Sequence, residues 1–192
     1  MIIWINGAFG AGKTQTAISL RHRLPNAFIY DPEEAGFYIR SNIPDSMQKT
    51  DFQQHTLWRF IVYEHLAYMA RNTEDVIIVP MTITEPIYYE EIIGQLRKDG
   101  HQVHHLVLTA SEETLRVRLT KRGNKQNSWA AQQITRCVQG LSNPIFENKL
   151  TTDNMSITEV VEAIGRQQGL QLQKDHRSWW KARWPQVTSR WR

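Results

Sequence analysis

The chain has 192 residues, 41% of them hydrophobic, which predicts one globular domain with one sizeable core. A single cysteine, Cys137, excludes an internal disulfide and favours the reducing cytoplasm, and no stretch reaches the roughly 18 apolar residues of a membrane span. The net charge of +4 does not indicate nucleic-acid binding, because residues 170–192 hold six of the 23 basic residues but only one of the 19 acidic ones.

The first predicted element is a strand over Ile2–Asn6, and a glycine-rich loop follows it. Residues 7–14 read Gly-Ala-Phe-Gly-Ala-Gly-Lys-Thr, and apolar residues at helical spacing come next. A strand, this loop and a helix in succession are the context that a phosphate-binding loop requires. Glycines let backbone N–H groups approach phosphate oxygens, and the helix N-terminus adds its positive dipole end. The sequence therefore predicts binding of a nucleoside triphosphate.

The side chains of this loop have expected roles. Lys13 is expected to reach the β- and γ-phosphates, and the Thr14 hydroxyl to ligate Mg²⁺. ATP and Mg²⁺ are thus the expected cofactors, although these residues do not distinguish ATP from GTP. The predicted nucleotide-binding residues are Gly7, Ala8, Phe9, Gly10, Ala11, Gly12, Lys13, Thr14 and Gln15.

Four more strands are predicted, with helical patterns between them. The strands are Ala27–Tyr30, Val76–Val79, Val103–Leu108 and the short Leu150–Thr152. The later helical patterns cover residues 51–71, 84–100 with Thr84 as the cap, a segment that begins at Ser111, 128–140 and 156–168. This alternation predicts an α/β fold, a P-loop NTPase with a five-stranded parallel sheet flanked by helices.

Ligands of parallel α/β sheets bind outside the carboxyl ends of the strands, so polar residues there are the next candidates. Asp31 follows the second strand and is expected to face Lys13, where it can accept a proton from a substrate hydroxyl or hold Mg²⁺. The alternative is ordinary Asp-Pro turn chemistry. The third strand ends without the usual Walker B carboxylate, and Met81 and Thr82 are expected to line the substrate side instead.

Arginines are the expected partners of the transferring phosphoryl group. Arg118 and Arg122 are four residues apart on one predicted helix face, and the polar stretch 123–127 after them is expected to close as a short lid. Two guanidinium groups suit the spreading negative charge of phosphoryl transfer, and a solvated basic face is the alternative. Weaker candidates, each weighed against an ordinary surface arginine, are Arg40 and Arg59 for the acceptor substrate and Arg136 for the phosphoryl group.

The other reactive side chains are expected to be structural. His104 and His105 are adjacent on a strand, so they point to opposite faces and do not chelate one metal. His65 lies on the apolar side of its helical pattern and is expected to be a hydrogen-bonded core histidine. Cys137 has no histidine at a suitable spacing and is expected to be buried and inert.

Residues 170–192 are expected to form a basic, Trp-rich tail after a kinase-like domain over residues 1–169. Tryptophan mixed with Arg and Lys is typical of membrane interfaces, so peripheral membrane contact through residues 175–192 is one interpretation. Packing on the body, binding a partner and disorder are the alternatives, because Pro185 interrupts a continuous helix. The N-terminus lacks a basic leader, so we expect no secretory signal.

Several segments together carry a resemblance to a known family. They are Ile2–Gly10, Tyr30-Asp31-Pro32-Glu33, Ile78–Thr82, Asn127–Ala131 and Pro144–Glu147. Over roughly residues 1–169 the chain resembles the bacterial tunicamycin-resistance protein family, and it is more distantly similar to adenylate, gluconate, shikimate and chloramphenicol kinases. The resemblance implies a nucleoside monophosphate kinase-like fold, ATP binding and protection from a nucleoside antibiotic. In these kinases an Asp after the second strand is the base or Mg²⁺ partner and an Arg-x₃-Arg pair clasps the nucleotide, which fits Asp31, Arg118 and Arg122.

Three functions are compatible with these residues. The first is Mg-ATP-dependent phosphoryl transfer to a hydroxyl of tunicamycin or a similar small molecule, with Asp31 activating the acceptor. The second is a nucleotide-gated binding protein that sequesters the drug unmodified, at the membrane surface through its tail. The third is a housekeeping nucleoside or sugar kinase, because a fold does not fix a substrate. The sequence indicates no oligomeric state.

Overall fold

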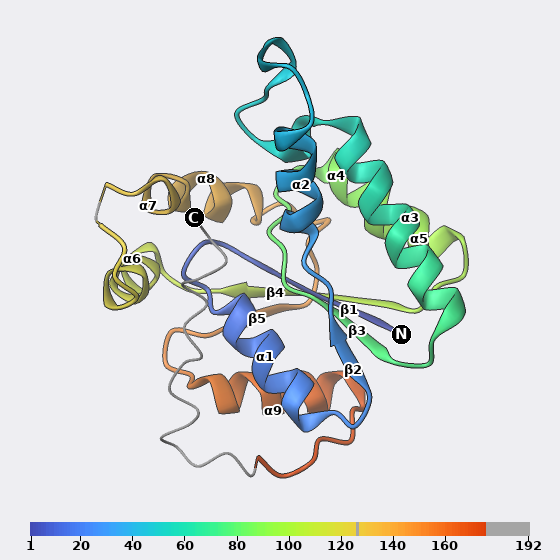
Figure 1. Ribbon diagram of the computed structural model, residues 1–192. Coiled ribbons are helices and arrows are strands. Elements are labelled where there is room, and N and C mark those ends of the chain that lie inside the picture. Colours follow the sequence, from blue (N-terminus) through green and yellow to red (C-terminus); the bar gives the residue numbers. More distant parts are fainter. Residues whose placement is uncertain (126, 176–192) are drawn as a thin grey trace.

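The computed structural model describes residues 1–125 and 127–175, which build a five-stranded parallel sheet between two layers of helices (Figure 1). The sheet has the order β2-β3-β1-β4-β5. Its strands are β1 Ile2–Gly7, β2 Ala27–Ile29, β3 Val76–Val79, β4 Val103–Thr109 and β5 Lys149–Thr151. All neighbouring strands pair in parallel, so the predicted α/β fold is confirmed and only the strand ends differ by a residue.

Helices connect the strands of the described residues. They are α1 Lys13–Arg23, α2 Pro32–Ser41, α3 Thr56–Asn72, α4 Pro86–Tyr89, α5 Gln95–Lys98, α6 Glu112–Lys121, α7 Trp129–Gln132, α8 Ile134–Gly140 and α9 Ile157–Gln168. Two 3₁₀ turns, η1 Asp45–Met47 and η2 Phe52–Gln54, lie between α2 and α3, and a π-helical stretch, η3 Glu90–Gly94, joins α4 to α5. In Figure 1, α1 and α9 lie on one side of the sheet, and α3 and α5 lie on the other.

The central strand β1 determines where the core lies. Its alternate residues Ile3 and Ile5 pack with α1 and α9, whereas Ile2 and Trp4 pack with α3 and α5. All four side chains are fully buried, as expected for a strand with helices on both faces. The carboxyl end of β1 is therefore held rigidly between two apolar layers.

Helix starts were the least accurate part of the sequence prediction. Helix α2 was missed, although Asp31 accepts a hydrogen bond from the backbone N–H of Glu33 and Pro32 occupies the first turn, which are ordinary helix-start signals. The helix predicted from Asp51 begins at Thr56, because Asp51 caps the separate turn η2. The predicted cap Thr84 is also wrong, since α4 begins at Pro86 after Glu85.

Burial corrects the prediction for His65 and confirms that Cys137 is buried. His65 is exposed, with its ring 4.9 Å from that of Tyr30, because the buried face of α3 follows Trp58, Val62 and Leu66 instead. His105 is buried and His104 is only partly so, as opposite strand faces require. Cys137 is fully buried, and burial raises the pKa of its thiol.

The chain continues to pack against the body after α9. Leu170 and Leu172 contact the core layer of α1 and α9, and Arg23 exchanges hydrogen bonds with Gln173, at 2.8 Å in each direction. The membrane-contact segment predicted over 175–192 lies, except for Asp175, outside the described residues, so it stays a prediction. Within the described residues, no helix is long and apolar enough to cross a membrane.

Replacing Gly7 with alanine tests the close approach of β1 to β4. Gly7 has φ +148°, and an added Cβ would lie 2.7 Å from the carbonyl oxygen of Leu108. We expect Gly7→Ala to lower the free energy of unfolding by about 3 kcal/mol in a urea titration. The control is Gly100→Ala, which has φ +84° but open space around its Cβ and should lose only about 1 kcal/mol. Equal losses would contradict the steric explanation.

Candidate functional site

The glycine-rich loop, residues 7–14, leaves the carboxyl end of β1 and leads into α1. Gly10 and Gly12 adopt positive φ values of 86° and 96°, which turn the chain back over the end of the strand. Ala8 and Ala11 are buried in the core, so the loop is anchored by its own small side chains. The free N–H groups at the start of α1 therefore point toward the space that the loop encloses, where an anion is favoured.

Lys13 lies over this loop. Its Nζ donates to the carbonyl oxygens of Gly7 at 2.9 Å and Ala8 at 3.1 Å, and it lies 5.5 Å from the ring centroid of Phe9. Burial lowers the pKa of Lys13 to about 8, while the negative charge of Glu33 acts in the opposite direction. An ammonium group with only carbonyl partners in a desolvated position is poised to gain an anionic partner.

Two carboxylates follow β2 at the same end of the sheet. Burial raises the pKa of Asp31, whose Oδ1 is engaged by the N–H of Glu33. Burial and the charge of Asp31 raise the pKa of Glu33 to about 7, against the opposing charges of Lys13 and Arg122. Glu33 is thus electrostatically coupled to the P-loop lysine, a role that the sequence did not predict. Its position in the first turn of α2 would have drawn attention to it had that helix been recognised.

Of the two arginines that were expected to act together, Arg118 is engaged by other groups of the protein. The Nη1 atom of Arg118 donates to Oγ1 of Thr152 at 3.0 Å, and its Nη2 contacts the backbone carbonyls of Thr152 and Asp153. Arg118 therefore fastens the loop after β5. Arg122 lies at the end of α6, and its charge acts on both Lys13 and Glu33. The predicted lid, residues 123–127, joins α6 to α7, and its Gln126 is not described, so closure stays a prediction.

Arg40 and Arg59 are engaged by the protein itself. Arg59 is buried, ion-paired with Glu91 and stacked 4.4 Å from the ring centroid of Tyr88. Arg40 donates to the carbonyl oxygens of Lys49 and Thr50. Both guanidinium groups hold the segment between α2 and α3 in place, which does not favour the acceptor-binding role that was expected of them.

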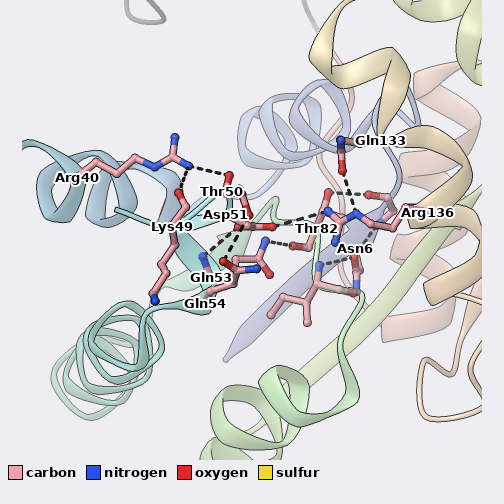
Figure 2. A network of polar contacts seen from close by, with 12 residues as sticks. Asn6, Arg40, Lys49, Thr50, Asp51, Gln53, Gln54, Thr82, Gln133 and Arg136 are labelled. Carbon is pink, nitrogen blue, oxygen red and sulfur yellow. Dashed lines mark hydrogen bonds and ion pairs between the residues drawn. The ribbon is translucent and has the colours of Figure 1, made fainter. Parts of the chain in front are cut away.

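A polar pocket of about 340 Å³ lies between that segment, the start of α4 and the helices α7 and α8. Its lining residues are Thr50, Asp51, Gln54, Glu85, Tyr88, Trp129, Gln133 and Arg136. Arg136 reaches Asp51 at 3.7 Å across it (Figure 2). The ring of Trp129 contacts that of Phe9 with centroids 5.1 Å apart, so the pocket borders the glycine-rich loop.

Met81 and Thr82 are both buried, and Thr82 contacts the start of the glycine-rich loop. The carbonyl of Met81 accepts a hydrogen bond from the Trp4 indole N–H at 3.0 Å, and its side chain lies in the core. Thr82 Oγ1 donates to the carbonyl of Gly7 at 2.8 Å. Their burial does not favour direct contact with a substrate.

The residues near the loop suit a metal that is held mainly by phosphate and water. Within the described part of the chain, no group of three or more His, Cys, Asp or Glu side chains could hold a metal ion. Thr14 lies in the first turn of α1, and Asp31 and Glu33 supply carboxylates at the same end of the sheet. Mg²⁺ commonly takes one or two protein oxygens in addition to substrate phosphates, so this donor set fits it.

Comparisons with known proteins agree with this geometry. Residues 2–144 match the family described as AAA domain. The chain is similar to the tunicamycin resistance protein of Deinococcus radiodurans, with 32% identity and a TM-score of 0.77 over 90% of this chain and 98% of that one. A sugar kinase from Janibacter sp. has 16% identity and a TM-score of 0.62 over 88% of this chain and 94% of that one. Shikimate kinase from Bacteroides thetaiotaomicron has 16% identity and a TM-score of 0.61 over 88% and 99%.

The two kinases are too distant to show more than the fold, which is that of a P-loop kinase. A search of curated proteins found no match.

The raised pKa of Glu33 predicts a pH-dependent stability. Between its ordinary pKa of 4.5 and about 7 the folded protein holds the Glu33 proton more tightly than the unfolded chain does, so stability falls as the pH rises through this window. We expect Glu33→Gln to be more stable than the wild type at pH 8 by about 1–2 kcal/mol, and nearly equal to it at pH 4. Urea titrations at both pH values measure this. The control Glu113→Gln removes an exposed carboxylate in the first turn of α6 and should leave the pH dependence unchanged.

Proposed function

The chain belongs to the AAA-domain family and to the tunicamycin-resistance proteins, and on this premise we propose that it protects the cell from tunicamycin by phosphorylating a hydroxyl of the drug with Mg-ATP. The observation that carries this proposal is the meeting of three features at one end of the sheet. They are the desolvated Lys13 over the glycine-rich loop, the partly buried carboxylates Asp31 and Glu33, and the polar pocket beside Trp129. These features support the proposal because phosphoryl transfer needs a cationic phosphate site, a proton acceptor and room for an acceptor.

Phosphoryl transfer depends mainly on positioning and on neutralising the charge of the moving group. Lys13 and the start of α1 bind the phosphates, and Arg122 adds positive charge at the same place. Thr14 and Asp31 would hold Mg²⁺, which supplies further neutralisation of the phosphates when it is bound. The acceptor proton passes to a carboxylate, either Asp31 as the sequence predicted or Glu33, whose pKa of about 7 suits a general base.

A second function is a nucleotide-gated protein that binds tunicamycin without modifying it. Two observations favour it: β3 ends in Val79 without a carboxylate after it, and Asp31 is already engaged as the cap of α2. In either function we place the protein in the cytoplasm, with peripheral contact to the inner face of the membrane through residues 175–192 as a further proposal.

Mass spectrometry of the drug separates the two functions. We expect tunicamycin incubated with the protein and Mg-ATP to gain the mass of one phosphoryl group, and Lys13→Ala to abolish this gain because the triphosphate loses its main cationic partner. Unmodified drug that copurifies with the protein only when nucleotide is present would favour sequestration instead. Drug that is neither bound nor modified would contradict both and leave a kinase with another acceptor.

Paired substitutions identify the proton acceptor. Asn at position 31 can still cap α2, so we expect Asp31→Asn to bind ATP normally but to lose about 10²–10⁴-fold in kcat if Asp31 is the base. If Glu33→Gln shows that loss and Asp31→Asn does not, Glu33 is the base. Stopped-flow nucleotide binding and steady-state phosphorylation measure the two effects. Full activity in both variants would exclude carboxylate catalysis at this site.

A further inference from the structure

A buried glutamine lies between the polar pocket and the glycine-rich loop. Gln53, in the turn η2, is only 9% exposed, although it is a polar residue in a short connecting segment. Its side-chain amide Nε2 donates to the backbone carbonyl of Thr82 at 2.9 Å (Figure 2). This bond joins the segment before α3 to the segment after β3, which are 29 residues apart in the sequence.

Thr82 carries the connection onward to the phosphate-binding loop. Its Oγ1 donates to the carbonyl oxygen of Gly7 at 2.8 Å, and the Nζ of Lys13 donates to the same oxygen at 2.9 Å. The Gly7 carbonyl therefore accepts hydrogen bonds from both the P-loop lysine and Thr82, the residue to which Gln53 is bonded. If Lys13 turns toward a phosphate, the Gly7 carbonyl keeps the hydrogen bond from Thr82 Oγ1 and loses the one from Lys13.

The other end of the connection is the wall of the pocket. The backbone N–H of Gln53 donates to Oδ1 of Asp51 at 3.0 Å, and Oδ2 of Asp51 lies 3.7 Å from Nη2 of Arg136. The backbone carbonyl of Gln53 accepts from the buried Arg59, which fixes the turn from the other side. A ligand that contacts Asp51 or Arg136 therefore acts on the turn that holds Gln53. The side chain of Gln53 is connected to the Gly7 carbonyl by two hydrogen bonds, one to Thr82 and one from Thr82.

We propose that Gln53 is a positioning residue that couples the polar pocket to the phosphate-binding loop. This proposal rests on the proposed function only in taking the pocket as the acceptor site. Because coupling between two sites is reciprocal, nucleotide binding at the loop must alter the turn at residues 51–54, and a ligand in the pocket must alter nucleotide affinity. A glutamine is needed at this point because the buried Thr82 carbonyl requires a donor, and an apolar side chain of the same length supplies none.

Hydrogen exchange with Mg-ATP alone tests this coupling, so the result does not depend on whether tunicamycin is phosphorylated. In the wild type we expect Mg-ATP to slow amide exchange both at residues 6–14 and at 49–56, the latter by at least about threefold. In Gln53→Met the slowing at 6–14 should remain and that at 49–56 should disappear. Selective loss of the distant effect is a result that a merely structural role for Gln53 would not give, because destabilisation would raise exchange at many sites.

Two further variants control the experiment. Gln48→Met removes an amide that also donates to a backbone carbonyl, that of Arg40 at 2.8 Å, but on the surface, and it should keep the response at 49–56. Thr82→Val removes the next bond while retaining side-chain volume. It should reproduce the effect of Gln53→Met, and the double variant should lose no more than either single one. Should Gln53→Met fail to fold, Thr82→Val gives the same answer.

Two outcomes would overturn the proposal. The first is a wild-type protein in which Mg-ATP protects 6–14 and leaves 49–56 unchanged. The second is an undiminished response at 49–56 in both Gln53→Met and Thr82→Val.

Discussion

The desolvated ammonium group of Lys13 is the interaction on which the site depends. It rests on the carbonyls of Gly7 and Ala8, at the end of a strand that is buried on both faces. The backbone of the loop that carries it is closely packed: an added Cβ at Gly7 would meet Leu108, and one at Gly10 would meet Leu115, each at 2.7 Å. Packing against β4 and α6 therefore fixes the backbone of the loop from which Lys13 extends.

This placement gives the site a charge balance that changes when nucleotide binds. Lys13 and Arg122 face the carboxylate of Glu33, whose pKa is raised to about 7 by burial and by Asp31. A triphosphate competes with Glu33 for both cations, and its negative charge favours the protonated carboxyl. Under the proposed function, nucleotide binding and proton uptake by Glu33 are therefore linked.

The sequence predicted the features that are local, and it was less successful where long-range packing decides. The P-loop, all five strands and the burial of Cys137 follow from short patterns of glycine, β-branched and apolar residues. Arg118 looked equivalent to Arg122 in the sequence, and Arg59 was a weaker candidate for the acceptor. Residue spacing cannot show that Thr152 and Glu91 are the partners of Arg118 and Arg59. The pocket was also invisible, since its walls come from four segments that only the fold brings together.

The character of the pocket bears on the kind of acceptor that fits it. Among the described residues, Arg136 is the only cation in its lining, and its charge is already balanced by Asp51, while Glu85 adds a second carboxylate. A phosphorylated acceptor, such as a nucleoside monophosphate, would bring two negative charges to a lining that is net negative, which disfavours it. Amide groups and the rings of Tyr88 and Trp129 instead offer hydrogen bonds and flat apolar faces to a neutral, hydroxyl-rich molecule. Under the proposed kinase function, the charge of this pocket favours a neutral hydroxyl-bearing acceptor over a phosphorylated one.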